Sequence, residues 1–545
     1  MEMSSPPNAF AGGTIMSSPR LELPDRPDLE ASRARGLHHL LKHFKLPTAG
    51  GAGRFIGRAR GRVLETALTL HALRLGELDP LWQRRLQDYL LRHEPEADPI
   101  SRLFASAVLG RPQGRDAVAT LNALLGDLEY GKRRKKALLL MLMVEVGVLP
   151  LERTGMVLED FSARAAHRFS QLYGAASRII HDRYSGGTSK QVWYDLGFLE
   201  SCQHANGSWE QQSLITLVAM LGLGPAHPAF ARGLQFLRRL EREDGGIPFI
   251  PDVDVWFNAL AGITLQAGPS LPYARREVAH FIAARQHANG GWSFTDSVQQ
   301  TDTDCTANCV QVLLQEGPQR FAPAIDRALD YFLELRREDG GYPAYEREGE
   351  SESTLTANIL LVQSLCVHRR PDLLPAMRQA RQFLREKQRS DGRFETSWSM
   401  SETYSLFRVL WALETHQAVD PDHPPDTVRE RALRYLLESQ RADGGWGQTA
   451  LSPSDGLSTA YALSALSLPR SATQVPATCT QRAAAFLLRQ QDPETGSFVS
   501  IPDQMGPRPI PYDVPLLSTL MSVMALSLAL QRSDQQWSEE ARHAG

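Results

Sequence analysis

The chain has 545 residues, a length that predicts about two to four domains and a large buried core. Hydrophobic residues make up 42% of the chain, charged residues make up 22%, and the formal net charge is only -3. These values are typical of a soluble globular protein. They argue against a nucleic-acid-binding protein, which is expected to carry a basic surplus, so we expect no nucleic-acid partner.

The cysteines and the start of the chain indicate where the protein works. The five cysteines include no CxxC pair and no histidine at a metal-ligand spacing. This pattern predicts reduced thiols and no disulfide framework. The first fifty residues are rich in Ser, Pro, Gly and Arg and lack the apolar core of a signal peptide. We therefore expect a cytoplasmic location.

The first third of the chain predicts helices. Residues 1–54 are interpreted as a mobile tail followed by one early helix over 29–42. From there apolar residues recur at steps of three and four, the pattern of helices with one buried face. This stretch carries no motif that indicates chemistry. The predicted helices cover 62–75, 81–92, 117–128, 132–148 and 161–181.

Residues 137–151 form the most apolar run and follow a basic cluster at Lys132–Lys136. The run is too short to span a membrane, and Glu145 interrupts it. We interpret it as a buried helix with a solvated basic start. Weak peripheral contact with anionic lipid is the alternative.

A glycine-centred turn recurs from residue 203 onward. Six copies read QHANGSW, EREDGGI, QHANGGW, RREDGGY, QRSDGRF and QRADGGW, and a degenerate copy covers 491–498. The first glycine falls at 207, 245, 290, 340, 392, 444 and 496, so the period settles at 52 residues. Two helical segments lie between successive turns. This period predicts an α/α toroid, in which the inner helices surround a cavity.

The stretch 299–310, QQTDTDCTANCV, follows the third turn. It places Asp302 and Asp304 two positions apart where a loop enters an apolar helix over 307–314. On spacing alone these residues are ordinary helix caps. The triplet Thr306-Ala-Asn308 lies sixteen residues after Gly290, and the same triplet ending at Asn358 lies sixteen after Gly340.

The sequence DxD-C-T-A after a QxxxGxW turn resembles the acid motif of class II terpene cyclases, and the turns resemble their QW motifs. The resemblance covers about Gln203–Leu530. It implies an all-α fold with two α/α-barrel (toroid) domains in the βγ arrangement of that family. The γ domain would cover 55–273 and the β domain 274–535, with the early helix docked on the β domain and a tail over 536–545. No DDxxD motif is present, so no diphosphate-ionising chemistry is expected. We interpret the QW turns mainly as scaffold.

Protonation of an alkene needs a carboxylic acid that burial or a second carboxylate keeps protonated. By resemblance Asp304 is the general acid and Asp302 tunes it. Cys305 would be a weak hydrogen-bond partner on the unprotonated oxygen of the acid. Asn308 is our substitute for the histidine that hopene-type enzymes place near the acid.

Carbocations require aromatic walls and no nucleophiles. Trp256 and Phe257 lie in a segment that resembles the family sequence PVWDTAL, and Trp398, Tyr404 and Phe407 resemble a later W…Y segment. Taken alone, each aromatic candidate is more often part of a core than of a cavity wall. The further candidates for substrate binding are Trp292, Tyr461 and Tyr512.

A prenyl diphosphate needs cationic partners, and bidentate arginine suits phosphate. Arg508 lies in a loop that resembles an MGPRP-type segment of bacterial class II cyclases, and Arg393 is a second diphosphate candidate. Glu243 and Asp244 lie where plant relatives carry an acidic motif associated with magnesium. Mg²⁺ is therefore the expected cofactor, although a solvated turn is the alternative for these two residues.

The resemblance implies cyclisation of a small isoprenoid substrate, geranylgeranyl or farnesyl diphosphate, to a copalyl/labdane- or drimane-type bicycle that keeps its diphosphate. One alternative is a chain without diphosphate, such as squalene or a prenylated aromatic. Another is a non-terpenoid toroid with a carbohydrate-directed or binding role. A zinc protein prenyltransferase subunit shares the toroid, but no Asp–Cys–His ligand set has the spacing for it.

Overall fold

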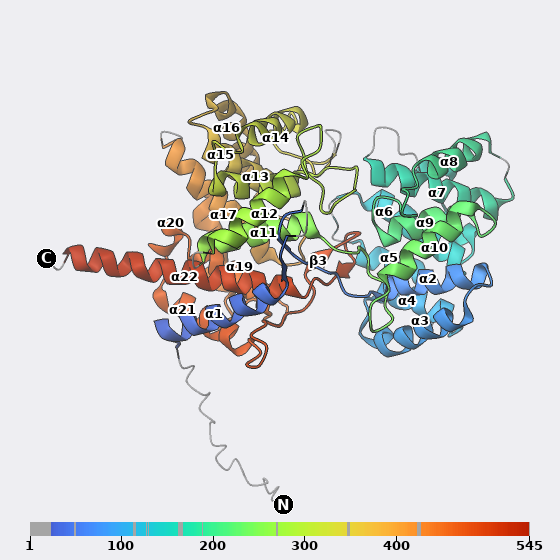
Figure 1. The fold of residues 1–545 in the computed structure, drawn as a ribbon, viewed down its shortest axis with the longest axis horizontal. Helices are drawn as coiled ribbons and strands as arrows, with labels where there is room; N and C mark the ends of the chain where they lie inside the picture. Colours follow the sequence, from blue (N-terminus) through green and yellow to red (C-terminus); the bar gives the residue numbers. More distant parts are fainter. Residues whose placement is uncertain are drawn as a thin grey trace, which may run out of the picture.

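The computed structural model describes residues 23–47, 51–112, 116–126, 128, 130–161, 167–187, 189–268, 271–345, 349–421 and 427–543; of 533–543 only the backbone is described. The predicted tail before residue 23 lies outside this part. Helices dominate and gather in two groups (Figure 1). Strand β1 (Phe44–Lys45) pairs antiparallel with β2 (Arg54–Phe55), and β3 (Gln504–Met505) pairs antiparallel with β4 (Pro511–Tyr512).

The first group is a barrel whose inner helices α2, α4, α6, α7 and α9 pack against one another in a closed ring. Helices α3, α5, α8 and α10 pack on the outside. Short 3₁₀ helices cover Glu94–Glu96, Leu151–Arg153 and Leu158–Phe161. The α-helices are α2 (Val63–Leu75), α3 (Pro80–His93), α4 (Pro99–Val108), α5 (Ala117–Leu124), α6 (Lys132–Val146), α7 (Arg168–Ser185), α8 (Lys190–Ser201), α9 (Ser213–Leu223) and α10 (Pro228–Leu240).

The second group is a larger barrel. Its inner helices α11, α13, α15, α17, α19 and α22 form a closed ring, with α12, α14, α16, α18, α21 and α1 outside it. Its elements are α1 (Arg26–Lys42), α11 (Asp254–Ala267), α12 (Pro272–Ala283), α13 (Thr303–Glu316), α14 (Ala322–Leu335), α15 (Ser353–Cys366), α16 (Leu374–Lys387), α17 (Glu402–Val419), α18 (Val428–Ser439), α19 (Gly456–Leu466), α20 (Pro469–Ala472), α21 (Ala477–Arg489), α22 (Leu516–His543) and a 3₁₀ turn at Pro371–Leu373.

Two of the predicted domain limits differ from this packing. Helix α11 packs against α13 and α22, so it belongs to the second barrel, whereas the sequence analysis assigned it to the first. The predicted tail over 536–545 is helical as far as His543, because α22 continues through it. The early helix α1 packs along α22 and completes the outer ring of the second barrel (Figure 1). The exact limits of the two domains stay a prediction.

The recurring turns join the outer helices to the inner ones. In the turn that precedes α13, Gly290 adopts φ +87°, and a Cβ there would collide with the carbonyl oxygen of Arg327. The Nε2 atom of Gln286 donates to the carbonyl oxygens of Gly290 and Ala324, both at 2.8 Å. The indole of Trp292 donates to the Ile282 carbonyl oxygen at 2.8 Å. These bonds tie each turn to its neighbouring helices, which fits the scaffold role expected of the motif.

The last copy of the turn reaches the start of the chain. Gln491 Nε2 donates to the carbonyl oxygen of Ser32 on α1 at 2.9 Å, the same type of bond that Gln286 makes to the next outer helix. The N-terminal helix therefore takes the place of the outer helix that would follow α21 in sequence.

The apolar run in α6 is a buried helix, as predicted, and Ala137 to Glu145 are all buried. Its basic start is only partly solvated, because the Nζ atom of Lys135 is buried. No helix among the described residues combines the length and apolar character needed to cross a membrane.

Candidate active site

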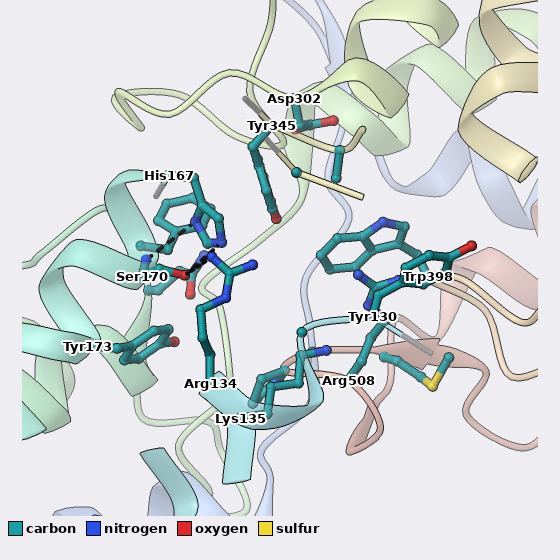
Figure 2. Close-up of a pocket in the computed structure, with 18 of the residues that line it drawn as sticks. Tyr130, Arg134, Lys135, His167, Ser170, Tyr173, Asp302, Tyr345, Trp398 and Arg508 are labelled. Carbon is teal, nitrogen blue, oxygen red and sulfur yellow. Dashed lines mark hydrogen bonds between the residues drawn. The ribbon is translucent and has the colours of Figure 1, made fainter. Parts of the chain in front are cut away.

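A cavity of about 240 Å³ lies between the two barrels. Residues of α6 and α7 line it from the first barrel, and the N-terminal ends of α11, α13 and α15 line it from the second. Among the labelled side chains in Figure 2, Asp302 lies at one end of the cavity lining, and Arg134 and Lys135 lie at the other. The cavity therefore connects the acid motif of the second barrel with the basic helix start of the first.

Asp304 lies in the first turn of α13 and lines the cavity. Its Oδ2 atom accepts a hydrogen bond from Trp256 Nε1 at 2.9 Å. Its Oδ1 atom accepts one from Asn308 Nδ2 at 3.1 Å and one from Asn358 Nδ2 at 2.8 Å. Burial raises the pKa of Asp304, and Arg408 opposes that rise most strongly. A carboxyl group in this setting retains its proton more readily than an exposed one.

Two of these neighbours were missed by the sequence analysis. Asn358 comes from α15 and Arg408 from α17, and both are buried. The guanidinium of Arg408 donates to the Oδ1 atoms of both Asn308 and Asn358. The only signal for Asn358 in the sequence was the repeated Thr-Ala-Asn triplet, and no signal pointed to Arg408.

Asp302 is both a helix cap and a cavity residue. As the N-cap of α13, its side chain accepts a hydrogen bond from Cys305 N at 2.7 Å. Burial raises the pKa of Asp302 to about 7, and the neighbouring Asp304 adds to the rise. The Cys305 thiol bonds to Asp302 and not to the acid itself, which corrects the sequence expectation. Asn308 does lie against Asp304; its catalytic role stays a prediction.

Aromatic side chains make up much of the cavity wall. Trp256, Trp398 and Tyr512 line it, in the positions that the sequence analysis expected. The cavity also has aromatic residues that the sequence analysis did not select: Tyr130, Phe161, Phe169, Tyr173, Phe249, Phe294 and Tyr345. Most of these come from the first barrel or from loops, where no motif marked them.

Five aromatic residues predicted for the cavity wall lie behind it, because their rings are used in packing. Trp292 is fully buried in its turn, and Phe257 packs at Gly57, where a Cβ would lie 2.8 Å from its ring. Tyr404 and Tyr461 pack together with ring centroids 4.9 Å apart. Phe407 stacks on a neighbouring tryptophan of its own helix. None of the five is among the residues that line the cavity.

The opposite end of the cavity is cationic. Lys135 and Arg134 lie in the first turn of α6, and His167 is the N-cap of α7. Among the described residues, Lys135 Nζ has no hydrogen-bond partner although it is buried. Burial lowers the pKa of Lys135 well below its ordinary value, and the Arg508 charge contributes. Burial also lowers the pKa of His167 to about 3. Two helix N-termini and a buried amino group, whose protonated form an anion would stabilise, suit an anionic ligand.

Carboxylates also line the cavity, and Glu350 and Glu352 partly offset its basic end, since the charge of each raises the pKa of Lys135. Asp160 accepts from Arg133 at 2.6 Å, and Glu350 accepts from Gly131 N at 3.1 Å. Glu352 forms a buried bidentate pair with Arg508, with N–O distances of 3.0 and 3.1 Å.

The two predicted diphosphate arginines differ in position. Arg508 lines the cavity and lies over the Trp398 ring at 4.4 Å from its centroid, but the pair with Glu352 occupies two of its nitrogens. Arg393 lies away from the cavity, bound to Asp391 and Glu402. Its place in the turn before α17 explains this position, so the structure does not support a diphosphate role for Arg393.

The predicted magnesium residues also lie elsewhere. Glu243 and Asp244 are exposed in the turn after α10, and Asp244 caps its own turn through Gly246 N at 3.0 Å. Their surface hollow holds arginines as well as carboxylates, and Arg85 and Arg238 already pair with Glu241 there. Across the described chain, no group of three or more His, Cys, Asp or Glu side chains is placed to hold a metal ion. These donors do not fit a resident Mg²⁺. The arginines around them are Arg85, Arg92, Arg238 and Arg242.

Comparisons with known proteins agree with this site. Residues 282–500 match the family described as squalene-hopene cyclase C-terminal domain. The chain is 32% identical over 540 residues to a drimenyl diphosphate synthase of Streptantibioticus cattleyicolor, covering 95% of this chain and 98% of that protein. It is 33% identical over 494 residues to a drimenyl diphosphate synthase of Streptomyces showdoensis, covering 87% and 90%.

The fold also matches a solved structure. The ent-copalyl diphosphate synthase from Streptomyces platensis aligns with a TM-score of 0.61 at 18% identity, covering 92% of this chain and 99% of that one. Two α/α barrels and a buried aspartic acid on an aromatic cavity are the features expected of a class II terpene cyclase. The chain belongs to the bacterial class II terpene cyclases and is an enzyme of that class.

Proposed function

We propose that this enzyme cyclises farnesyl diphosphate to a drimane-type bicyclic diphosphate and that the diphosphate stays on the product. The observation that carries the proposal is the polarity of the cavity, with the buried acid Asp304 at one end and the buried, unpartnered amino group of Lys135 beside Arg134 at the other. This polarity suits a long apolar chain with an anionic head.

The two relatives of known name favour the fifteen-carbon chain. Both drimenyl diphosphate synthases match nearly the whole length of this chain, and a drimane skeleton is the bicycle that a farnesyl chain can form. Geranylgeranyl diphosphate is therefore the less suited substrate.

In the proposed reaction Asp304 donates its carboxyl proton to the distal double bond of the substrate. The resulting tertiary cation is attacked by the middle double bond, which forms the first ring and a new tertiary cation. The proximal double bond then attacks that cation and forms the second ring. Loss of a proton next to the last cation restores a double bond. One proton enters and one leaves, so the reaction is an isomerisation.

The remaining side chains bind the substrate and exclude water. The indole of Trp256 and the rings of Trp398 and Tyr512 offer aromatic faces to the cations, which they stabilise without reacting with them. Lys135 and Arg134 bind the diphosphate, assisted by the N-terminal ends of α6 and α7. No step in this scheme runs through a metal ion.

The test is incubation of the purified enzyme with farnesyl and geranylgeranyl diphosphates in parallel, with Mg²⁺ and with a chelator. Products are dephosphorylated and analysed by gas chromatography–mass spectrometry, alongside Asp304→Asn. We expect a drimane-type alcohol from the farnesyl substrate, and no cyclic alcohol from the variant.

Other outcomes would change the proposal. If only the geranylgeranyl substrate gave a bicyclic alcohol, the proposed substrate would change from farnesyl to geranylgeranyl diphosphate. Linear alcohols from both substrates would contradict a diphosphate substrate and would favour a diphosphate-free polyprene. Cyclisation by Asp304→Asn at the wild-type rate would contradict the acid assignment. Loss of activity with the chelator would show that the reaction needs a divalent cation.

A further inference from the structure

We propose that Arg408 is a positioning residue for the acid: it orients the amides of Asn308 and Asn358 so that both donate to Oδ1 of Asp304, which leaves Oδ2 as the oxygen that carries the proton. This inference rests on the proposed function, because it assumes that Asp304 is the proton donor. It goes beyond that function because it assigns the proton to one oxygen and names the residue that controls it.

The first step concerns the orientation of the two amides. Arginine offers only N–H donors and is charged at all accessible pH values. Arg408 Nη2 lies 3.0 Å from Asn308 Oδ1, and its Nε donates to Asn358 Oδ1. Because Arg408 cannot accept a hydrogen bond, each amide must turn its oxygen toward the guanidinium. Each amide nitrogen then faces Asp304.

The second step concerns the proton. Oδ1 of Asp304 accepts from Asn308 Nδ2 at 3.1 Å and from Asn358 Nδ2 at 2.8 Å. A carboxyl oxygen has two lone pairs, and these two donors occupy both. The proton therefore resides on Oδ2. The partner of Oδ2 is the indole N–H of Trp256, a residue that lines the cavity, so the acidic hydrogen lies on the substrate side.

The third step concerns acid strength. Arg408 is the largest influence that opposes the rise in the pKa of Asp304, and it is not among the main groups that act on Asp302. Its charge stabilises the carboxylate that remains after proton transfer, and thus makes Asp304 a stronger acid. The other titratable groups around Asp304 are Asp302, Cys305 and Cys309 from the start of α13, Tyr404 from α17 and Tyr512 from β4.

The chain provides the amide pair through its own repeat. Asn308 and Asn358 occupy the same position in two successive copies, in α13 and α15, which are neighbours in the inner ring. Arg408 comes from α17, the next helix in that ring. Three consecutive inner helices therefore each contribute one side chain to the support of a single carboxyl group.

The test compares Arg408→Gln, Arg408→Lys and Asn358→Ala with two matched controls. Arg532 is also a buried arginine on an inner helix, but it binds backbone carbonyls such as that of Val475 at 2.8 Å. Asn258 is also a buried asparagine on an inner helix, but it bridges to Phe55. Arg532→Gln and Asn258→Ala thus remove similar buried bonds without touching the acid. For each enzyme kcat and KM for farnesyl diphosphate are measured across pH.

We expect kcat of Arg408→Gln to fall about tenfold or more with little change in KM, because acid strength and not binding is lost. A general acid must be protonated, so activity declines as pH rises through its pKa. Without the Arg408 charge the pKa of Asp304 increases, and the decline moves to higher pH. Asn358→Ala should move it in the same direction, and Arg408→Lys should restore part of both effects.

The inference would be overturned if activity declined at the same pH as in wild type in Arg408→Gln, Arg408→Lys and Asn358→Ala. This holds whatever the loss of rate in the three variants. The same would follow if the two controls shifted the decline equally. This failure differs from failure of the proposed function, since there Asp304→Asn itself would still cyclise the substrate. If Arg408→Gln does not fold, Asn358→Ala and Arg408→Lys carry the same test.

Discussion

At the acid end of the cavity, each oxygen of Asp304 has at least one hydrogen-bond donor, whereas at the opposite end Lys135 Nζ has no hydrogen-bond partner among the described residues. Both groups are buried, and burial disfavours the charged form of each. The first group is surrounded by fixed protein partners, and the second has no such partner in the described part of the chain.

This difference follows from the two tasks. A proton donor must hold one geometry and one protonation state before the substrate arrives, so its partners are built in. A binding cation does best when its partner is the ligand itself, because a buried charge without a partner is costly until an anion enters. The largest effects on catalysis are therefore expected at the acid end, and effects on binding at the Lys135 end.

Asp304→Asn should have the largest effect, since it removes the proton donor and keeps the shape of the side chain. We expect kcat to fall by about 10³-fold or more, while the affinity for the diphosphate substrate stays near wild type. The measurement is kcat by product analysis together with substrate binding by calorimetry. Thr354→Val is the control, because Thr354 holds the equivalent position in α15 and contacts Ser405. A similar loss of kcat in both variants would contradict the comparison.

Lys135→Met should have the opposite kinetic signature. Removing a buried charge-assisted contact with the diphosphate is expected to raise KM about tenfold or more, with the same cyclic product. Lys132→Met is the matched control, because Lys132 is exposed on the same helix start and its Nζ bonds to Gly126 O at 3.0 Å. Equal KM values for wild type and Lys135→Met would show that the diphosphate does not bind at this end.

Asp302→Asn should change how stability depends on pH. The pKa of Asp302 in the folded protein is raised from its ordinary 3.8 to about 7, so the folded state holds this proton more strongly than the unfolded state does. Its contribution to stability is therefore complete below the ordinary pKa and is lost as pH rises toward 7. Asparagine can still cap α13.

Urea unfolding of wild type and Asp302→Asn at a series of pH values checks this expectation. As pH rises, the free energy of unfolding of the variant minus that of wild type should increase. This difference should become constant above about pH 7. Other carboxyl groups with a raised pKa, such as that of Asp455, are present in both proteins. Their contribution to the free energy of unfolding therefore cancels in the difference. Parallel curves would show that Asp302 titrates normally in the folded state.

The smallest effect should come from the scaffold shared by the two aligned repeats. Thr306 Oγ1 accepts from Trp292 N at 2.9 Å, and Thr356 Oγ1 accepts from Tyr342 N at 3.0 Å. Replacing either threonine with valine leaves a buried N–H without a partner, at a cost of about 1–3 kcal/mol in stability. Chemical denaturation should give similar losses for Thr306→Val and Thr356→Val. A much larger loss of stability in Thr306→Val would indicate that this hydrogen bond contributes more to stability in the repeat that carries Asp304 than in the next repeat.

The same two repeats show how far the sequence predicts the site. Asp302 and Glu352 occupy equivalent positions, and their backbone N–H groups bond to Trp292 O and Tyr342 O at 2.9 and 3.0 Å. Asp302 caps its helix beside the acid, but Glu352 binds Arg508 directly. The spacing predicts the shared turn because the turn is local. It does not predict the partner of Glu352, which comes from a loop far along the chain.

The sequence by itself predicted the all-α fold class and the repeated helix pairs, and its family resemblance pointed to Asp302, Asp304 and several aromatic residues of the cavity wall. These features depend on helix periodicity, on a glycine at positive φ and on residues within one repeat. Only the tertiary structure decided that Asn358 and Arg408 support Asp304 and that Lys135 belongs to the cavity. These contacts join residues from different helices and from both barrels, and therefore depend on how the helices and barrels pack.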